Sequence, residues 1–371
     1  MIRRLSVVGV GLFAALSWGC DGAAGGAQVR SANDGADSGG TGSAPAAAQV
    51  ITLPGAPPGI GFDDLRLVHL PDQPAWIVVP GGRTGNVALI EPASGQVTTI
   101  GGFSADAVYG GSHDFGVTSV DGEFDGLFAV DRTSKKVHLI DPLKKKIVGS
   151  AALSASPDYV RYFLPFRALW VTEPDAEQIE VFDMPTVGGA EAAYVAGGAP
   201  VKSATIQVKG GPESLVFDLR RSRAFTNTWA GSTVVLDPGE NKVLATWPNG
   251  CEKSRGLAAG EGILFVACAE GKVSALDMDS GKQLGILDTK GPDVDILAYA
   301  PALRHLYVPS AKTGALAIVG VSAKGELSLL GSVKAADGSH CVAADESGNA
   351  YVCDPAHGAI LKIKDPYPAT R

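Results

Sequence analysis

The stretch GPESLVFDLRRSRAFTNTWAGSTVVLDPGENKVLATW, residues 211–247, contains the pattern that decides the fold. It holds four short runs rich in β-branched and aromatic residues, at 215–218, 224–227, 233–237 and 242–247. Gly, Pro, Asn, Asp and Ser separate these runs and supply the backbone geometries of tight antiparallel turns. The stretch therefore predicts a four-stranded meander. A single sheet of this kind has bare edges and apolar faces, so it needs to stack against copies of itself.

The turn between the third and fourth strands of this meander recurs along the chain. Successive copies lie about 40 to 54 residues apart, which is the spacing of propeller blades rather than of helical solenoids. The copies are LIEPASGQV (89–97), LIDPLKKKI (139–147), VFDMP (181–185), VLDPGENKV (235–243), ALDMDSGKQL (275–284), IVGVSAKGEL (318–327) and LKIKDP (361–366). They predict an all-β fold, a seven-bladed β-propeller of four-stranded antiparallel blades spanning residues 49–371.

The last blade has only three predicted strands after residue 339. The segment QVITL, residues 49–53, is the simplest source of the missing fourth strand. Pairing the N-terminal strand with the C-terminal blade would close the ring and leave no free sheet edge. The third blade carries a Gly- and Ala-rich insertion at 185–202, for which the sequence leaves a mobile loop and a lid as alternatives.

The second and third strands of several units carry a family resemblance. They read WVTEPDAEQIEVFD (170–183), AFTNTWAGSTVVLD (224–237), LYVPSAKTGALAIV (306–319) and AYVCDPAHGAILKI (350–363). These segments resemble the tyrosine-valine-threonine-asparagine (YVTN) β-propellers of bacterial envelopes and archaeal surfaces. The resemblance implies a propeller exposed at the cell envelope. It implies no activity, because propellers of one outline serve enzymes, scaffolds and receptors.

Residues 1–20 read as a secretory signal peptide outside the fold. Two arginines precede an apolar run at 5–18, which is too short to span a bilayer as a mature helix. The sequence LSWGC, ending at Cys20, resembles a lipobox, in which the Cys becomes the lipidated first residue. Cleavage by ordinary signal peptidase near Ala23 or Ala24 is the alternative. We therefore expect an exported, membrane-anchored bacterial lipoprotein that faces the periplasm or the cell surface.

Residues 21–48 are almost entirely Gly, Ala, Ser, Asp and Asn, so they predict a flexible tether. The net charge is -8, and removing the first 19 residues takes away two arginines and no acid, which gives -8 - 2 = -10. This acidity argues against nucleic acid and anionic lipid as partners, because both need clustered Lys and Arg. We expect a monomer that contacts the membrane through its lipid anchor only.

Apart from Cys20 the chain has four cysteines. Cys341 and Cys353 flank a predicted hairpin at equal distances from its turn, so they face each other across two antiparallel strands. Cys251 and Cys268 flank the corresponding hairpin of the fifth blade. An even count in an exported chain favours the bridges Cys251–Cys268 and Cys341–Cys353. A metal site is the alternative, but no CxxC motif occurs.

Charged residues gather where the innermost strand of each blade begins. Alignment of the blades gives Asp64, Asp114, Asp158, Glu213, Arg255, Asp295 and His340, with a loose register for the first two. A ring of acids at the channel mouth would raise carboxylate pKa values or bind a hard cation such as calcium. The alternative is that each acid only caps the turn before a strand. Loops of the same face carry Arg83, Glu173, Asp175, Trp229 and His357; Trp229 is either a ligand platform or a blade-packing residue.

No catalytic motif is present: GxSxG, HExxH, a P-loop and an EF-hand are all missing from the sequence. ALDMDSGK (275–282) resembles a quinoprotein repeat but lacks its closing Trp, so we expect no cofactor, with calcium or another divalent cation as the alternative. We therefore expect a binding or scaffold module for an envelope protein or a small molecule. Its alternative is a metal-dependent lactonase-type hydrolase or lyase. The predicted ligand-binding residues are Asp158, Glu213, Trp229, Arg255, Asp295 and His340.

Overall fold

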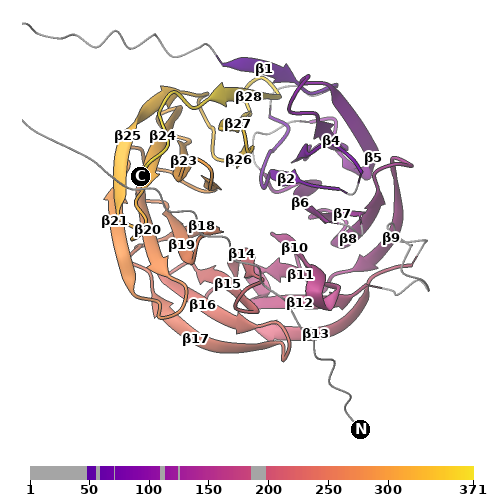
Figure 1. The fold of residues 1–371 in the computed structure, drawn as a ribbon. Coiled ribbons are helices and arrows are strands. Elements are labelled where there is room, and N and C mark those ends of the chain that lie inside the picture. Colours follow the sequence, from indigo (N-terminus) through magenta and orange to yellow (C-terminus); the bar gives the residue numbers. More distant parts are fainter. Residues whose placement is uncertain (1–47, 56–58, 71, 109–112, 124–125, 185–197) are drawn as a thin grey trace, which may run out of the picture. The chain divides into compact units, whose positions relative to one another are not determined.

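The fold is a ring of seven antiparallel blades, each with four strands, as the sequence predicts (Figure 1). The computed structural model describes residues 48–55, 59–70, 72–108, 113–123, 126–184 and 198–371. Of the predicted insertion in the third blade, positions 185–197 lie outside the described residues, as do the predicted signal peptide and nearly all of the tether. Among the described residues there is no helix with the length and apolar composition needed to cross a membrane.

The first three blades follow each other along the chain. Blade 1 contains β2 (Arg66–Val68), β3 (Trp76–Pro80), β4 (Thr84–Ile90) and β5 (Val97–Ala105). Blade 2 contains β6 (Val117–Glu123), β7 (Gly126–Asp131), β8 (Lys136–Asp141) and β9 (Lys146–Ala152). Blade 3 contains β10 (Val160–Phe163), β11 (Ala168–Glu173), β12 (Gln178–Asp183) and β13 (Val201–Gln207), with the short 3-10 helices η1 (Leu164–Phe166) and η2 (Pro174–Ala176) between strands.

The next three blades are regular four-stranded meanders. Blade 4 contains β14 (Glu213–Asp218), β15 (Arg223–Thr228), β16 (Ser232–Asp237) and β17 (Lys242–Pro248). Blade 5 contains β18 (Ser254–Gly260), β19 (Ile263–Cys268), β20 (Lys272–Asp277) and β21 (Gln283–Asp288). Blade 6 contains β22 (Ala298–Ala300), β23 (His305–Ser310), β24 (Ala315–Val321) and β25 (Leu327–Lys334).

Blade 7 joins the two ends of the domain. It contains β26 (Val342–Ala344), β27 (Asn349–Asp354), β28 (Ala359–Lys364) and, as its outer strand, β1 (Gln49–Thr52). β1 runs antiparallel to β28, with Gln49 opposite Lys362 and Thr52 opposite Ala359 (Figure 1). This pairing confirms the predicted closure of the ring.

Burial differs between strands of one blade. Every residue of the second strands β7, β11, β19 and β23 is buried, whereas the fourth strands β13 and β17 are mostly exposed. The second strand packs against neighbouring blades with both faces, so it reads as a continuous apolar run, while the fourth strand lies at the rim. Large side chains such as Trp170, Tyr307 and Tyr351 fill the space between blades.

The ring has two faces, which we name by their connections. The mouth face carries the loops between second and third strands and the connections from blade to blade; the opposite face carries the other turns. The chain reaches the mouth face at Leu53, whose N–H donates to the carbonyl of Gly358 at 3.2 Å. Both predicted disulfides are confirmed and lie toward the mouth face, with Cα atoms 5.2 Å apart in Cys251–Cys268 and 5.7 Å apart in Cys341–Cys353.

Candidate functional site

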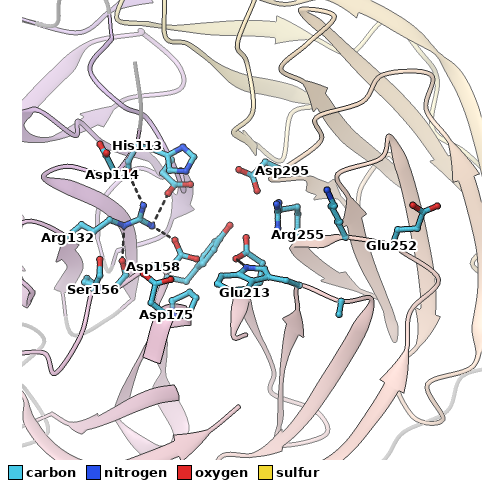
Figure 2. Close-up of a pocket in the computed structure, with 17 residues that line it drawn as sticks. His113, Asp114, Arg132, Ser156, Asp158, Asp175, Glu213, Glu252, Arg255 and Asp295 are labelled. Carbon is cyan, nitrogen blue, oxygen red and sulfur yellow. Dashed lines mark hydrogen bonds and ion pairs between the residues drawn. The ribbon is translucent and has the colours of Figure 1, made fainter. Parts of the chain in front are cut away.

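A pocket of about 990 Å³ opens on the mouth face, and its walls come from blades 2 to 5 and from the segments that precede blades 1, 2, 3, 5 and 6 (Figure 2). Carboxylates predominate in it: Asp63, Asp114, Asp158, Asp175, Glu213, Glu252 and Asp295. The cationic side chains of the wall are Arg132, Lys253 and Arg255, and His113, Tyr159 and Trp229 add rings. Five of the six predicted ligand-binding residues therefore line one pocket, namely Asp158, Glu213, Trp229, Arg255 and Asp295.

A local irregularity at the start of β14 places Glu213 in the pocket. The pairing of β14 with β15 shifts register between Glu213 and Val216, and Ser214 has a left-handed backbone with φ of 63°. Such a bulge re-aims a side chain at the end of a strand. The buried Ser214 hydroxyl accepts the N–H of Leu257 at 3.0 Å, which links the innermost strands of blades 4 and 5. The start of β14 is therefore held by its pairing with β15 and by the hydrogen bond to blade 5.

Arg132 organises one side of the pocket (Figure 2). Its Nε donates to the carbonyl of Pro157 at 2.9 Å and its Nη1 to the carbonyl of His113 at 2.8 Å. Its Nη2 donates to the Asp158 carboxylate and lies 3.6 Å from Oδ2 of Asp63. Burial opposes the charge on Arg132, but the carboxylates of Asp158 and Asp63 outweigh burial and raise its pKa. This arginine holds three chain segments together.

Arg132 is not among the residues predicted from the sequence, although a signal was available. It is the first residue after the second strand β7, and Trp229 is the first residue after the second strand β15. The two positions are equivalent in their blades, but only the tryptophan was predicted as a site residue. A systematic alignment of this position would have found the arginine.

Glu213 and Trp229 form the blade 4 wall. The indole N–H of Trp229 donates to Oε2 of Glu213 at 2.8 Å. Glu213 is 9% exposed, whereas Trp229 is 41% exposed, so the ring is presented at the surface of the pocket and does not pack between blades. Burial, together with the charges of Asp158 and Asp295, raises the pKa of Glu213 to about 8.

Two further carboxyl groups of the pocket have raised pKa values. Burial raises the pKa of Asp158 to about 6, since the nearby Arg132 offsets only part of the desolvation. Burial and the charge of Asp158 raise the pKa of Asp63 well above its ordinary value. Burial also lowers the pKa of His113, which favours its neutral ring. The pocket therefore holds protons at neutral pH that exposed carboxylates would have lost.

Arg255 and Asp295 lie across the opening from Arg132 and Asp158 (Figure 2). The guanidinium of Arg255 donates only to the carbonyl of its neighbour Ser254, at 3.3 Å, within the described part of the chain. The carboxylate of Asp295 has no hydrogen bond or ion pair to any described residue. Both groups are available to a ligand.

Some predicted positions need correction. Asp64 does not line the mouth pocket; it pairs with the buried Arg161, with Oδ1 2.9 Å from Nη2, and accepts the Ser119 hydroxyl at 2.6 Å. Its neighbour Asp63 takes the place in the pocket, because a shift of one residue turns a side chain to the other side. His340 also lies outside the lining.

The ring of His340 bridges two backbone carbonyls, those of Gly338 at 2.7 Å and Phe62 at 2.9 Å. It packs against His113, which does line the pocket, with ring centroids 5.4 Å apart. In the described structure His340 therefore connects blade 7 to the segment before blade 1 and stands behind the pocket wall.

Of the other predicted loop residues, some lie at the pocket and some lie elsewhere. Asp175 lines the pocket, and Arg83 pairs with the lining residue Asp114 at 2.7 Å. Glu173 is fully buried and accepts the N–H of Ala155 at 3.1 Å. His357 pairs with Asp354 at 2.8 Å at a separate groove between blades 6 and 7.

The spacing of the potential metal ligands shows whether the pocket has a preformed metal site. Among the described residues, the groups of three potential metal ligands that converge within 4.8 Å all include disulfide-bonded cysteines. No such group consists of the pocket carboxylates. Calcium takes six to eight oxygen ligands, and the described carboxylates do not provide a preformed cage of that kind.

Comparison with protein-family models and with curated protein sequences gives no match. Solved structures show the fold. A chain of a structure described as "Crystal Structure of Mitotic Checkpoint Complex" superposes with a TM-score of 0.68 at 14% sequence identity, over 91% of this chain and 100% of that chain. A chain of Kuenenia stuttgartiensis hydrazine synthase superposes with a TM-score of 0.61 at 12% identity, over 84% of this chain and 96% of that chain. At such identities the likeness establishes the seven-bladed β-propeller alone.

Proposed function

We propose that the protein is an exported β-propeller that binds a small molecule or an envelope protein in the mouth pocket, without turnover. The observation that carries the proposal is the convergence of Glu213, Trp229, Arg255 and Asp295 on one pocket of about 990 Å³. This volume is in the range of small-molecule sites. The confirmed disulfides fix nearby loops, and rigid loops lose less entropy on binding.

The cellular setting belongs to the same proposal. The two disulfides suit an oxidising compartment, as in exported proteins. The lipobox-like sequence supports a lipid anchor at Cys20, and the tether at 21–48 supports display at the envelope. The four strand-loop-strand repeats support placement among the YVTN-type propellers.

Recovery of a bound species tests the binding function. Wild-type protein would be incubated with envelope and metabolite extracts and analysed by native mass spectrometry beside Arg255→Ala. Glu240→Gln is the charge control, because Glu240 lies in an exposed turn of the opposite face. We expect a species that wild type and Glu240→Gln retain and Arg255→Ala loses. Identical spectra for the three proteins would contradict the proposal.

A second function, the metal-dependent lactonase-type hydrolase or lyase, is favoured by one observation. Glu213, with its pKa raised to about 8, carries a proton at neutral pH and is able to donate it to a leaving group. The enzyme would contain stoichiometric calcium or zinc by elemental analysis and would hydrolyse lactones, and Glu213→Gln would lose both. Retention of lactone hydrolysis by Glu213→Gln would exclude this role for the residue.

A further inference from the structure

The mouth pocket has more carboxyl groups than cationic side chains. Among the residues that the structure describes, seven carboxyl groups line it against three cationic side chains. Arg132 is committed within the protein: its three nitrogens serve the carbonyls of Pro157 and His113 and the carboxylate of Asp158. Its charge is shared between Asp158 and the more distant Asp63, at 3.6 Å, so the other described acids of the pocket have no contact with it.

Three carboxyl groups of the pocket, of which Asp63 and Glu213 are buried and Asp295 is half-buried, accept few or no hydrogen bonds from the described residues. Asp63 is 4% exposed, makes no hydrogen bond to any described residue, and has only an ion pair with Arg132 at 3.6 Å. Glu213 uses one oxygen, which accepts the indole N–H of Trp229. Asp295 has no side-chain partner among the described residues. Since unpaired buried polar groups are costly, this arrangement suits a ligand that supplies positive charge or donors.

Trp229 provides an independent observation. Its indole is 41% exposed at the pocket, and the hydrogen bond to Glu213 fixes the orientation of the ring. An ordered indole beside carboxylates is the environment in which proteins hold ammonium groups through cation–π attraction. The described carboxylates do not converge in threes, which disfavours a small metal ion and favours a larger cation that contacts them one at a time.

We propose that the mouth pocket binds an organic cation, an ammonium or guanidinium compound, between Trp229 and the carboxylates of Asp63, Glu213 and Asp295. This inference rests on the proposed binding function, because it gives the ligand class of the same pocket. Arg255 lies beside these acids and has no carboxylate partner of its own among the described residues, so it is available to an anionic group elsewhere on the ligand.

Binding of a cation should release protons from the pocket. The pKa of Glu213 is raised to about 8 by burial and by neighbouring acids, so at neutral pH the empty pocket holds a proton there. A bound cation favours the ionised carboxylate, and affinity should therefore rise with pH between about 6 and 8. The titratable and charged groups that face Glu213 are Asp158, Asp295, Arg255, Arg132 and Tyr159.

Isothermal titration calorimetry with defined probes tests the inference. The cationic probes are choline and cadaverine, and their neutral counterparts are dimethylbutanol and pentanediol; glutarate and calcium chloride represent anions and metal ions. We expect both cations to bind with proton release, measured in buffers of different ionisation enthalpy, and neither neutral counterpart to bind. Glu213→Gln keeps an acceptor for Trp229 but cannot ionise. It should weaken binding at least about tenfold and abolish the proton release, while Glu240→Gln should leave both unchanged.

The outcomes separate this inference from the function on which it rests. If wild type retains a pocket-dependent species from extracts but binds neither choline nor cadaverine, the organic-cation inference is wrong and the binding function stands. Calcium binding that is lost in Glu213→Gln, without binding of either organic cation, would replace it with a metal site. If no species from extracts depends on the pocket, the binding function itself fails.

Discussion

At the scale of single residues, Glu213 couples protonation to folding. Its pKa is raised from 4.5 to about 8, so between these values the folded protein keeps a proton that the unfolded chain has lost. Folding stability should therefore fall as pH rises through this window. We expect Glu213→Gln to remove this loss, since glutamine still accepts the indole N–H. At about pH 8.5 the variant should be a few kcal/mol more stable than wild type, because a tenfold difference in proton affinity between the folded and unfolded states corresponds to about 1.4 kcal/mol.

Urea denaturation at about pH 5 and pH 8.5 measures the effect. The control is Glu240→Gln, which removes the same charge from an exposed turn and should follow wild type at both pH values. If the unfolding free energies of wild type and Glu213→Gln change equally between the two pH values, the pKa of Glu213 is not raised in the folded state and the prediction is wrong.

Arg132 allows a second prediction at this scale. Arg132→Ala removes the donor to Asp158 and to two backbone carbonyls, so it leaves a buried carboxylate uncompensated. We expect a loss of about 3 kcal/mol in unfolding free energy. Adding Asp158→Asn to the variant should restore part of the stability, because the amide carries no charge. Chemical denaturation of the single and double variants would refute this if the second change destabilised further.

Residue-level prediction from the sequence was limited by register. The turn before β14 located Glu213 at the start of its strand, where it lines the pocket, because Gly-Pro precedes the acid and a regular strand follows. In blade 1 the innermost strand β2 is only three residues long, and the adjacent acids Asp63 and Asp64 gave no periodicity to choose between them. The position of Arg132 after a second strand could be found from the sequence, but its partners could not, because they lie between 19 and 69 positions away along the chain.

At the scale of elements, β1 is the strand that closes the ring. Its side chains alternate: Ile51 is 5% exposed and packs in the core, whereas Val50 is 59% exposed. We expect Ile51→Ala to cost about 2 to 4 kcal/mol, through lost burial and the cavity left behind. Val50→Ala in the same strand is the matched control and should cost less than about 0.5 kcal/mol. If Ile51→Ala and wild type had the same urea midpoint of unfolding, β1 would contribute little to the closure of the ring.

Each disulfide links the second strand of a blade to the segment just before the first strand of the same blade. Cys251 and Cys268 are 17 residues apart in sequence, and Cys341 and Cys353 are 12 apart. Replacing both cysteines of either pair with alanine should lower the unfolding free energy by about 3 kcal/mol on loop-entropy grounds. Non-reducing peptide mapping checks the pairing, and a peptide that links blade 5 to blade 7 would contradict it.

At the scale of the whole domain, repeated sequence determines the architecture more securely than any one strand does. The recurring turn between third and fourth strands fixed the number of blades, because each copy needs a neighbour to cover its apolar faces. The pocket depends on the arrangement of the blades around the axis. Its walls come from segments between residues 63 and 295, and only the closed ring brings them together.

The direction of β1 predicts how the domain is presented. Gln49 pairs with Lys362, nearer the opposite face, and the strand then runs to Thr52 at the mouth face. Any tether that precedes Gln49 therefore joins the domain on the side away from the pocket. On a biosensor surface, protein attached through its N-terminal tether should bind ligand at full capacity. Protein attached through biotin at position 252, on the rim of the pocket, should lose most of that capacity. Equal capacity in the two orientations would mean that the ligand enters from another face.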